Sequence, residues 1–118
     1  MQLSPAPGGG ALQAFFTEAN VKQSAQESGV YLLYRASRLI YVGMAAQGDT
    51  ILACLLAHHG GSRGTCTQAA TEFEYEMSAN PAALRYRHLS AYAERNAGQW
   101  PECNEKTRQT LPGNSSIK

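Results

Sequence analysis

The chain has 118 residues, of which 43% are hydrophobic and 8% aromatic, and this composition suits one small globular domain. Its formal net charge is +1, which excludes the strongly basic field of a general nucleic-acid binder. The sequence contains no apolar run long enough to span a membrane.

The N-terminal residues 1–10 include three consecutive glycines and two prolines, and they favour a flexible lead rather than an element of structure. This stretch also lacks the apolar core of a signal peptide. Within residues 11–27 we expect a short helix that docks on the domain, because its apolar residues share one helical face: Leu12, Phe15, Phe16 and Ala19.

Two β-prone runs follow, and each carries a tripeptide of glycine, tyrosine and an apolar residue. Residues 29–31 (Gly-Val-Tyr) begin the first run, and residues 41–43 (Tyr-Val-Gly) end the second. Residues 36–38 between them are few enough to close a hairpin. Antiparallel pairing would bring Tyr31 and Tyr41 together, and two phenols beside unencumbered glycine backbone can line a small polar cleft.

A helix is predicted after this hairpin, followed by a third strand. Asp49 or Thr50 can cap the helix, apolar residues recur at helical spacing, and Gly60-Gly61 stops it. A loop over residues 62–68 then leads to a strand over residues 72–77. There, aromatic and methionine side chains alternate with glutamates, which predicts one buried face and one acidic, solvent-exposed face.

A second helix is predicted to start at Asn80-Pro81, with Asn80 as its cap and Pro81 in its first turn, and to end by Gly98. The order strand, strand, helix, strand, helix indicates an α+β domain over residues 11–104, with a three-stranded antiparallel sheet flanked by helices. We expect residues 105–118 to form a disordered tail.

The tripeptide pair and this element order resemble the GIY-YIG nuclease family, whose name describes the pair. The resemblance extends to a small bacterial branch of stand-alone domains with further short motifs. This chain has those motifs in the same order between residues 29 and 104: His58, 64–67 (Gly-Thr-Cys-Thr), 70–71 (Ala-Thr), 80–81 (Asn-Pro) and 101–104 (Pro-Glu-Cys-Asn).

The resemblance implies hydrolysis of a phosphodiester, in which the two motif tyrosines help to activate water. It also implies a helix arginine that pairs with the phosphate, a histidine one turn later, a glutamate that holds a divalent metal, and an asparagine that braces the site. Five positions of this chain match that pattern: Tyr31, Tyr41, Gly43, His58 and Asn104.

The charged half of the site does not match. Cys54 stands one turn before His58, where the arginine belongs, and Arg87 or His88 stands where the glutamate belongs. An arginine at that place would repel Mg²⁺ rather than bind it. Two alternatives stay open: Arg63 in the following loop could replace the cation, and Glu76 or Glu94 could replace the carboxylate.

These observations predict a catalytically degenerate nuclease-like domain that binds DNA, RNA or a protein partner without efficient cleavage and needs no cofactor. Gly43, Arg63, Arg85 and Arg87 are the candidate substrate-binding residues, although the arginines of the second helix could also form a solvated helix face. One alternative is an active endonuclease with a rearranged site that uses Mg²⁺ or Mn²⁺. Another is a structural or regulatory subunit that presents the acidic strand face: Glu72, Glu74 and Glu76.

The three cysteines are Cys54, Cys66 and Cys103, an odd number in a sequence that begins without a signal peptide. A reducing cytoplasm is the simpler inference. Cys66 and Cys103 could bind zinc together with His58 or His59, but the spacing contains no close pair of ligands, and we predict no metal site.

Overall fold

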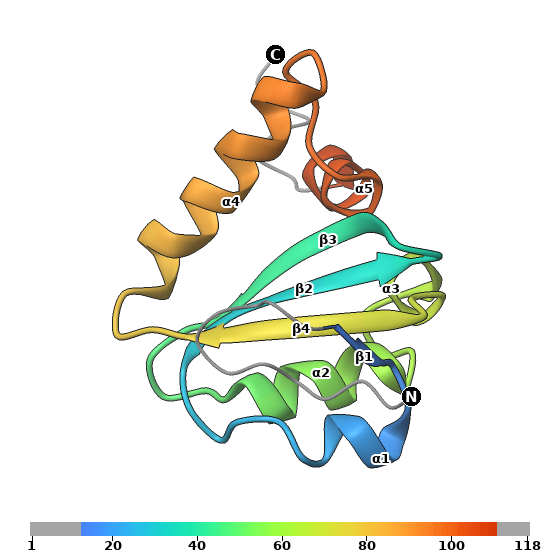
Figure 1. Ribbon diagram of the computed structural model, residues 1–118, viewed down its shortest axis with the longest axis vertical. Helices are drawn as coiled ribbons and strands as arrows, with labels where there is room; N and C mark the ends of the chain where they lie inside the picture. The colour runs from blue at the N-terminus through green and yellow to red at the C-terminus, as the bar shows by residue number, and fades with distance from the viewer. Residues whose placement is uncertain (1–12, 111–118) are drawn as a thin grey trace.

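The computed structural model describes residues 13–110 and shows a four-stranded antiparallel sheet in the order β1-β4-β2-β3 (Figure 1). The strands are β1 (Ala14–Phe15), β2 (Gly29–Arg35), β3 (Arg38–Ala45) and β4 (Glu72–Met77). Helices cover both faces of this sheet and the outer edge of β3. They are α1 (Glu18–Val21), α2 (Ile51–His59), α3 (Thr65–Gln68), α4 (Pro81–Arg95) and α5 (Glu102–Thr110).

The predicted hairpin is confirmed and determines which side chains meet. Ala36 and Ser37 have φ values of 51° and 70°, so they form a two-residue turn of the kind that matches strand twist. A bulge between Leu33 and Tyr34 shifts the pairing with β3. As a result Ile40 and Tyr41, although consecutive, both pack on the side of the sheet that faces α2.

The two helix starts predicted from capping are also confirmed. Thr50 Oγ1 accepts a hydrogen bond from the Ala53 N–H at 3.0 Å, at the start of α2. Asn80 Oδ1 accepts from the Ala83 N–H at 3.3 Å, at the start of α4. Each bond satisfies an amide that the helix itself leaves unpaired.

The sheet separates two apolar clusters. The larger cluster lies between the sheet and α2, and its members include Tyr31, Leu33, Ile51, Leu55 and Phe73. The smaller lies between the sheet and α4 and includes Val30, Leu32, Val42, Leu84 and Leu89. The motif tyrosines therefore belong to the α2 side.

The expected α+β class is confirmed, but the expected three strands are wrong, because the sheet has four. Residues predicted as one helix form β1 and the short helix α1 instead. Ala14 and Phe15 pair with Phe73 and Glu72 on the open edge of β4. A short apolar run fits either element, and the unpaired backbone of β4 decides in favour of the strand.

Two further segments differ from their predictions. The predicted loop over residues 62–68 contains the one-turn helix α3, and α5 extends through residues 105–110, which are predicted to belong to the disordered tail. Residues 1–10 and 111–118 lie outside the described residues, so the flexible lead and the rest of the tail stay predictions. Within residues 13–110, no helix is long and apolar enough to cross a membrane.

The glutamate face of β4 is only partly open to solvent, because α4 packs against β2 and β3 on that side of the sheet. Glu74 is only 8% exposed, and it accepts a hydrogen bond from the Tyr34 hydroxyl. Glu76 pairs with His88 of α4 at 3.8 Å. Alternation along the strand correctly separates apolar from acidic residues, but it does not show that a helix covers the acidic side.

Candidate functional site

The two motif tyrosines meet on the α2 side of the sheet. Tyr31 lies opposite Gly43, and Leu33 lies opposite Tyr41, so both phenols project from the same face of adjacent strands. Their ring centroids are 6.2 Å apart. This arrangement confirms the juxtaposition that the tripeptide pair predicts.

Gly43 is required by packing of the Tyr31 ring across β3. A Cβ atom at position 43 would overlap that ring and lie 2.5 Å from the Tyr31 hydroxyl oxygen, which real side chains do not tolerate. Gly43 is buried, so the structure gives it a steric role rather than an exposed surface for substrate. Because residue 43 has no side chain, the Tyr31 ring can pack directly over the backbone of β3.

His58, in the last turn of α2, joins the two tyrosines. Its ring centroid is 5.4 Å from that of Tyr31 and 5.0 Å from that of Tyr41. Its Nε2 lies 2.8 Å from the Tyr31 hydroxyl, and its Nδ1 lies 2.7 Å from Thr67 Oγ1. Burial, and secondly the charge of Arg63, lower the pKa of His58 to about 4, so the ring is neutral at pH 7.

A neutral imidazole carries one N–H, and this couples the two hydroxyls on either side of the ring. If Nδ1 donates to Thr67, then Nε2 accepts the proton of the Tyr31 hydroxyl. If Thr67 donates to Nδ1, then Nε2–H donates to Tyr31, and the phenolic proton is free to point into the cluster. Thr67 therefore controls the hydrogen-bonding state of Tyr31 through His58.

Sequence reasoning did not select Thr67 as a site residue. It lies in α3, within a segment predicted as a loop, and it comes into contact with His58 only because α3 packs against α2. The one signal in the sequence is its place in the Gly-Thr-Cys-Thr motif, which does not by itself indicate a partner.

Cys54 lies one helical turn before His58, buried next to Tyr31. Its thiol donates to Asp49 Oδ2 at 3.5 Å, and the positive charge of Arg63 acts on it from the loop after α2. Burial raises the pKa of this thiol, and the Asp49 carboxylate adds to the effect, so Cys54 is uncharged at pH 7. A neutral side chain thus stands at the helix position where the resemblance expects an arginine.

Two arginines bring positive charge to the cluster from outside α2. Burial raises the pKa of the Tyr41 phenol, while the charges of Arg85 and Arg63 oppose that rise, which shows that both cations act on this ring. Burial likewise raises the pKa of Tyr31, and neighbouring Tyr41 and Cys54 add to it. Both phenols are therefore protonated at pH 7 and can serve as hydrogen-bond donors.

Asn104 and Arg85 hold the backbone of the edge strand β3 next to Tyr41. The Val42 N–H donates to Asn104 Oδ1 at 2.8 Å, and Asn104 Nδ2 donates to the Val42 carbonyl at 3.0 Å. Arg85 Nε donates to the same carbonyl at 3.2 Å. Asn104, only 2% exposed, thus pairs with β3 as a neighbouring strand would, and its amide is used to brace the site.

The α4 residue whose charge acts on Tyr41 is Arg85, whereas Arg87, two positions later, is exposed. His88 faces Glu76 on the opposite side of the sheet. Successive helical residues project about 100° apart, so α4 directs Arg85 toward β3 and Arg87 toward solvent.

The side chains around the tyrosines do not fit a divalent metal. Glu74 and Glu76 project from the other face of β4, because Tyr75 between them faces Tyr31. Glu94 is exposed near the end of α4. The Asp49 carboxylate contacts the cluster only through the Cys54 thiol. The two arginines whose charges act on Tyr41 would repel a divalent cation there. In the described part of the chain, no group of three His, Cys, Asp or Glu residues could hold a metal ion.

Comparison with known proteins identifies no relative: neither a protein-family model, nor a curated protein, nor a solved structure matches this chain.

Proposed function

We propose that this domain binds a phosphodiester backbone, that of DNA or RNA, at the cluster of Tyr31, Tyr41 and His58, without cleaving it efficiently. The observation that carries the proposal is that Arg85 of α4 donates to the Val42 carbonyl next to Tyr41, while Arg63 lies in the loop after α2, so that cations from two parts of the chain lie near this ring. Two cations near the protonated, half-buried Tyr41 phenol provide both charge and a hydrogen-bond donor for a phosphate. The GIY-YIG resemblance leads to the same ligand class.

The chemistry of the cluster favours binding over hydrolysis. A phenol whose pKa is raised gives up its proton reluctantly, and Tyr31 and Tyr41 are both in that state. His58 is bonded through both ring nitrogens, so neither is free for water. Because the carboxylates of β4 face away, the cluster lacks the anions that would anchor a metal opposite a phosphate.

Fluorescence anisotropy with labelled single-stranded DNA, double-stranded DNA and RNA, repeated over a series of salt concentrations, tests this proposal. We expect Arg63→Ala and Arg85→Ala each to weaken binding and to lower the log–log salt slope by about one. Arg95→Ala is the matched control, since Arg95 is exposed and lies about 15 Å further along α4. Equal affinities for all three variants and the unaltered chain would refute the proposed site.

A second candidate is an active endonuclease with a rearranged site, and the position of Arg63 favours it. This side chain places a cation beside Tyr31, Tyr41 and Cys54, although it comes from the loop rather than from α2. Incubation of the protein with supercoiled plasmid and Mg²⁺ or Mn²⁺ separates the two candidates. Metal-dependent nicking that Arg63→Ala abolishes would establish the endonuclease and exclude pure binding.

A protein partner is the outcome to pursue if none of the nucleic acids binds. The cytoplasmic location also stays a proposal. Cys66 of α3 and Cys103 of α5 form a disulfide, which is more typical of an oxidising compartment. The location can be tested by quenching cells rapidly with acid and alkylating the free thiols, which measures how much of the Cys66–Cys103 pair is oxidised in the cell. A fully oxidised pair in cells would contradict a reducing cytoplasm.

A further inference from the structure

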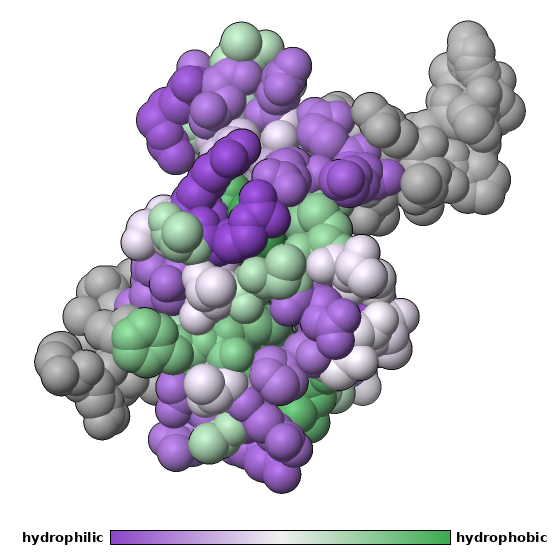
Figure 2. All heavy atoms as spheres, turned by 90° about the vertical axis from the view of Figure 1, so that its right-hand side faces the viewer, coloured by the Kyte–Doolittle hydropathy of each residue, from purple (hydrophilic) through white to green (hydrophobic). Residues whose placement is uncertain are grey.

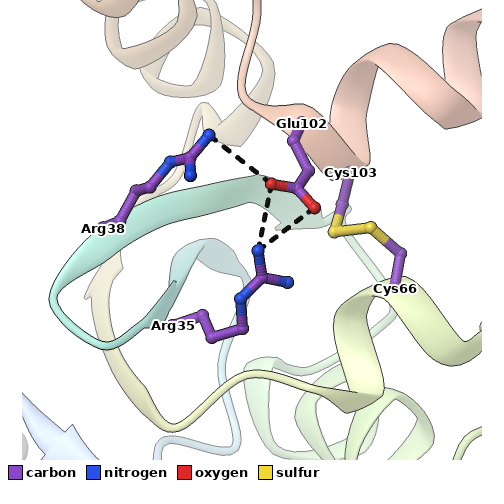
Figure 3. Close-up of polar contacts among 5 residues, drawn as sticks. All are labelled: Arg35, Arg38, Cys66, Glu102 and Cys103. Carbon is purple, nitrogen blue, oxygen red and sulfur yellow. Dashed lines mark hydrogen bonds and ion pairs between the residues drawn. A yellow bond between two sulfur atoms is a disulfide. The ribbon is translucent and has the colours of Figure 1, made fainter.

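A disulfide connects the two elements that hold the candidate site from outside the sheet. Cys66 in α3 is bonded to Cys103 in α5, 37 positions later (Figure 3). The residue after each cysteine makes a bond to the site: Thr67 to His58, and Asn104 to the Val42 backbone. The disulfide is therefore one residue away from both supports of the tyrosine cluster.

The α5 side of this link is anchored independently of the disulfide. Glu102 pairs with Arg35 at 3.2 Å and with Arg38 at 3.7 Å, at the end of the β2–β3 hairpin (Figure 3). Glu105 Oε2 accepts from the Trp100 N–H at 2.8 Å. Together with Asn104 these contacts fix the first turn of α5, so it can remain in place if the disulfide opens.

The α3 side is held much less firmly. This helix has four residues, and its N-cap, Gly64 with φ of 104°, provides no side-chain bond to the first turn. Within the described residues, the side-chain hydrogen bond that ties α3 to the rest of the domain is the one between Thr67 and His58. Arg63 immediately precedes the cap. Opening the disulfide would therefore release Arg63 and Thr67 together.

The disulfide also lies on a pocket that a thiol could enter. The pocket has a volume of about 220 Å³, and its lining includes both cysteines, Arg63 and Lys106. Cys66 is half-buried, whereas Cys103 is 1% exposed, so Cys66 is the accessible sulfur. Cations beside a sulfur stabilise its thiolate and so favour its release in exchange. Figure 2 shows the side of the molecule where α3 lies, with apolar surface bordered by hydrophilic groups.

We propose that Cys66–Cys103 is a redox switch that holds Arg63 and Thr67 against the tyrosine cluster when oxidised and releases them when reduced. The reductant is a dithiol, small molecule or protein. One thiolate attacks Cys66 Sγ, the S–S bond breaks, and its electron pair leaves on Cys103. The second thiol then attacks the mixed disulfide and frees Cys66, so that the dithiol is oxidised by two electrons and the two cysteines, after protonation, become thiols.

Two consequences follow in the reduced protein. His58 loses its hydrogen-bond partner Thr67 and the packing of α3 against α2. Solvent then reaches the ring, and the pKa of His58 rises from about 4 toward 6.5. The ligand site loses the Arg63 cation. The second consequence rests on the proposed function, whereas the first does not, and the two can be measured separately.

The first measurement is an NMR pH titration of the His58 ring in oxidised protein and in protein reduced with dithiothreitol, with Cys66→Ser/Cys103→Ser as the permanently open form. The second is oligonucleotide anisotropy on the same samples. We expect reduction to weaken binding by roughly tenfold or more. The double variant should show the weak affinity with or without dithiothreitol, and Arg95→Ala, an exposed substitution near the end of α4, should respond to reduction as the unaltered chain does.

An unchanged His58 titration on reduction overturns the switch, whatever the ligand data show. Global unfolding on reduction, seen as loss of amide protection throughout the sheet, also overturns it, because the disulfide would then be structural alone. If no oligonucleotide binds the oxidised protein, the proposed ligand is wrong, and the titration still decides the switch. Dithiothreitol titration of the unaltered chain provides this test even if the double variant does not fold.

Discussion

Replacing Asn104 by alanine should destabilise the fold rather than remove a catalytic group. The substitution deletes the acceptor of the Val42 N–H and one of the two donors to the Val42 carbonyl. The carbonyl keeps Arg85 Nε, at 3.2 Å. The buried amide of Val42 is left without a partner, because β3 is the outer strand and has no neighbour on that side.

The cost can be worked out from these contacts. A buried donor left unsatisfied costs about 1–3 kcal/mol, and the second lost hydrogen bond adds about 1 kcal/mol. The total of roughly 2–4 kcal/mol is a large part of the 5–15 kcal/mol that stabilises a typical domain. At about 4–8 °C per kcal/mol for a domain of this size, the melting temperature should fall by roughly 10–30 °C.

Urea unfolding followed by circular dichroism measures this loss. Asn96→Ala is the matched control, because Asn96 is exposed and bonds only locally, to the Tyr92 carbonyl of α4. Asn104→Asp keeps the acceptor but sets a carboxylate oxygen against a carbonyl, so its deficit should shrink as pH falls and the acid gains a proton to donate. A free energy of unfolding for Asn104→Ala within about 0.5 kcal/mol of the unaltered chain would refute the reasoning.

Three further outcomes are expected. Gly43→Ala should lose about 1–3 kcal/mol, because its Cβ overlaps the tyrosine ring above it, while Gly60→Ala changes stability little; equal urea midpoints would contradict this. The pKa of His58 is about 6.5 in the unfolded chain and about 4 in the folded protein, so the free energy of unfolding should fall by up to about 3 kcal/mol as pH drops through that window. Urea unfolding at a series of pH values measures this slope, and His58→Gln should remove it. Cys54→Arg with Arg85→Glu should gain Mn²⁺-dependent plasmid nicking by roughly two to three orders of magnitude, because it returns a cation to α2 and a carboxylate beside β3; a folded, inert double variant would show a remodelled cleft.

Local patterns in the sequence determined most of the framework. Strand alternation, the two capping residues Thr50 and Asn80, and the short turn after Arg35 each act over a few residues, and the structure confirms all of them. The proximity of Tyr31 and Tyr41 on one face of the sheet followed from the hairpin alone. These features are predictable because the interactions that cause them lie within one element or between adjacent ones.

Tertiary packing decided the rest, since it depends on contacts between distant segments. Whether Ala14–Phe15 becomes a strand depends on the open edge of β4, and whether Glu74 is exposed depends on where α4 lies. The register of α4 makes Arg85 rather than Arg87 the neighbour of Tyr41. The Cys66–Cys103 disulfide and the Thr67–His58 bond join α3 to α5 and α2, and no spacing in the sequence encodes a distance between those helices.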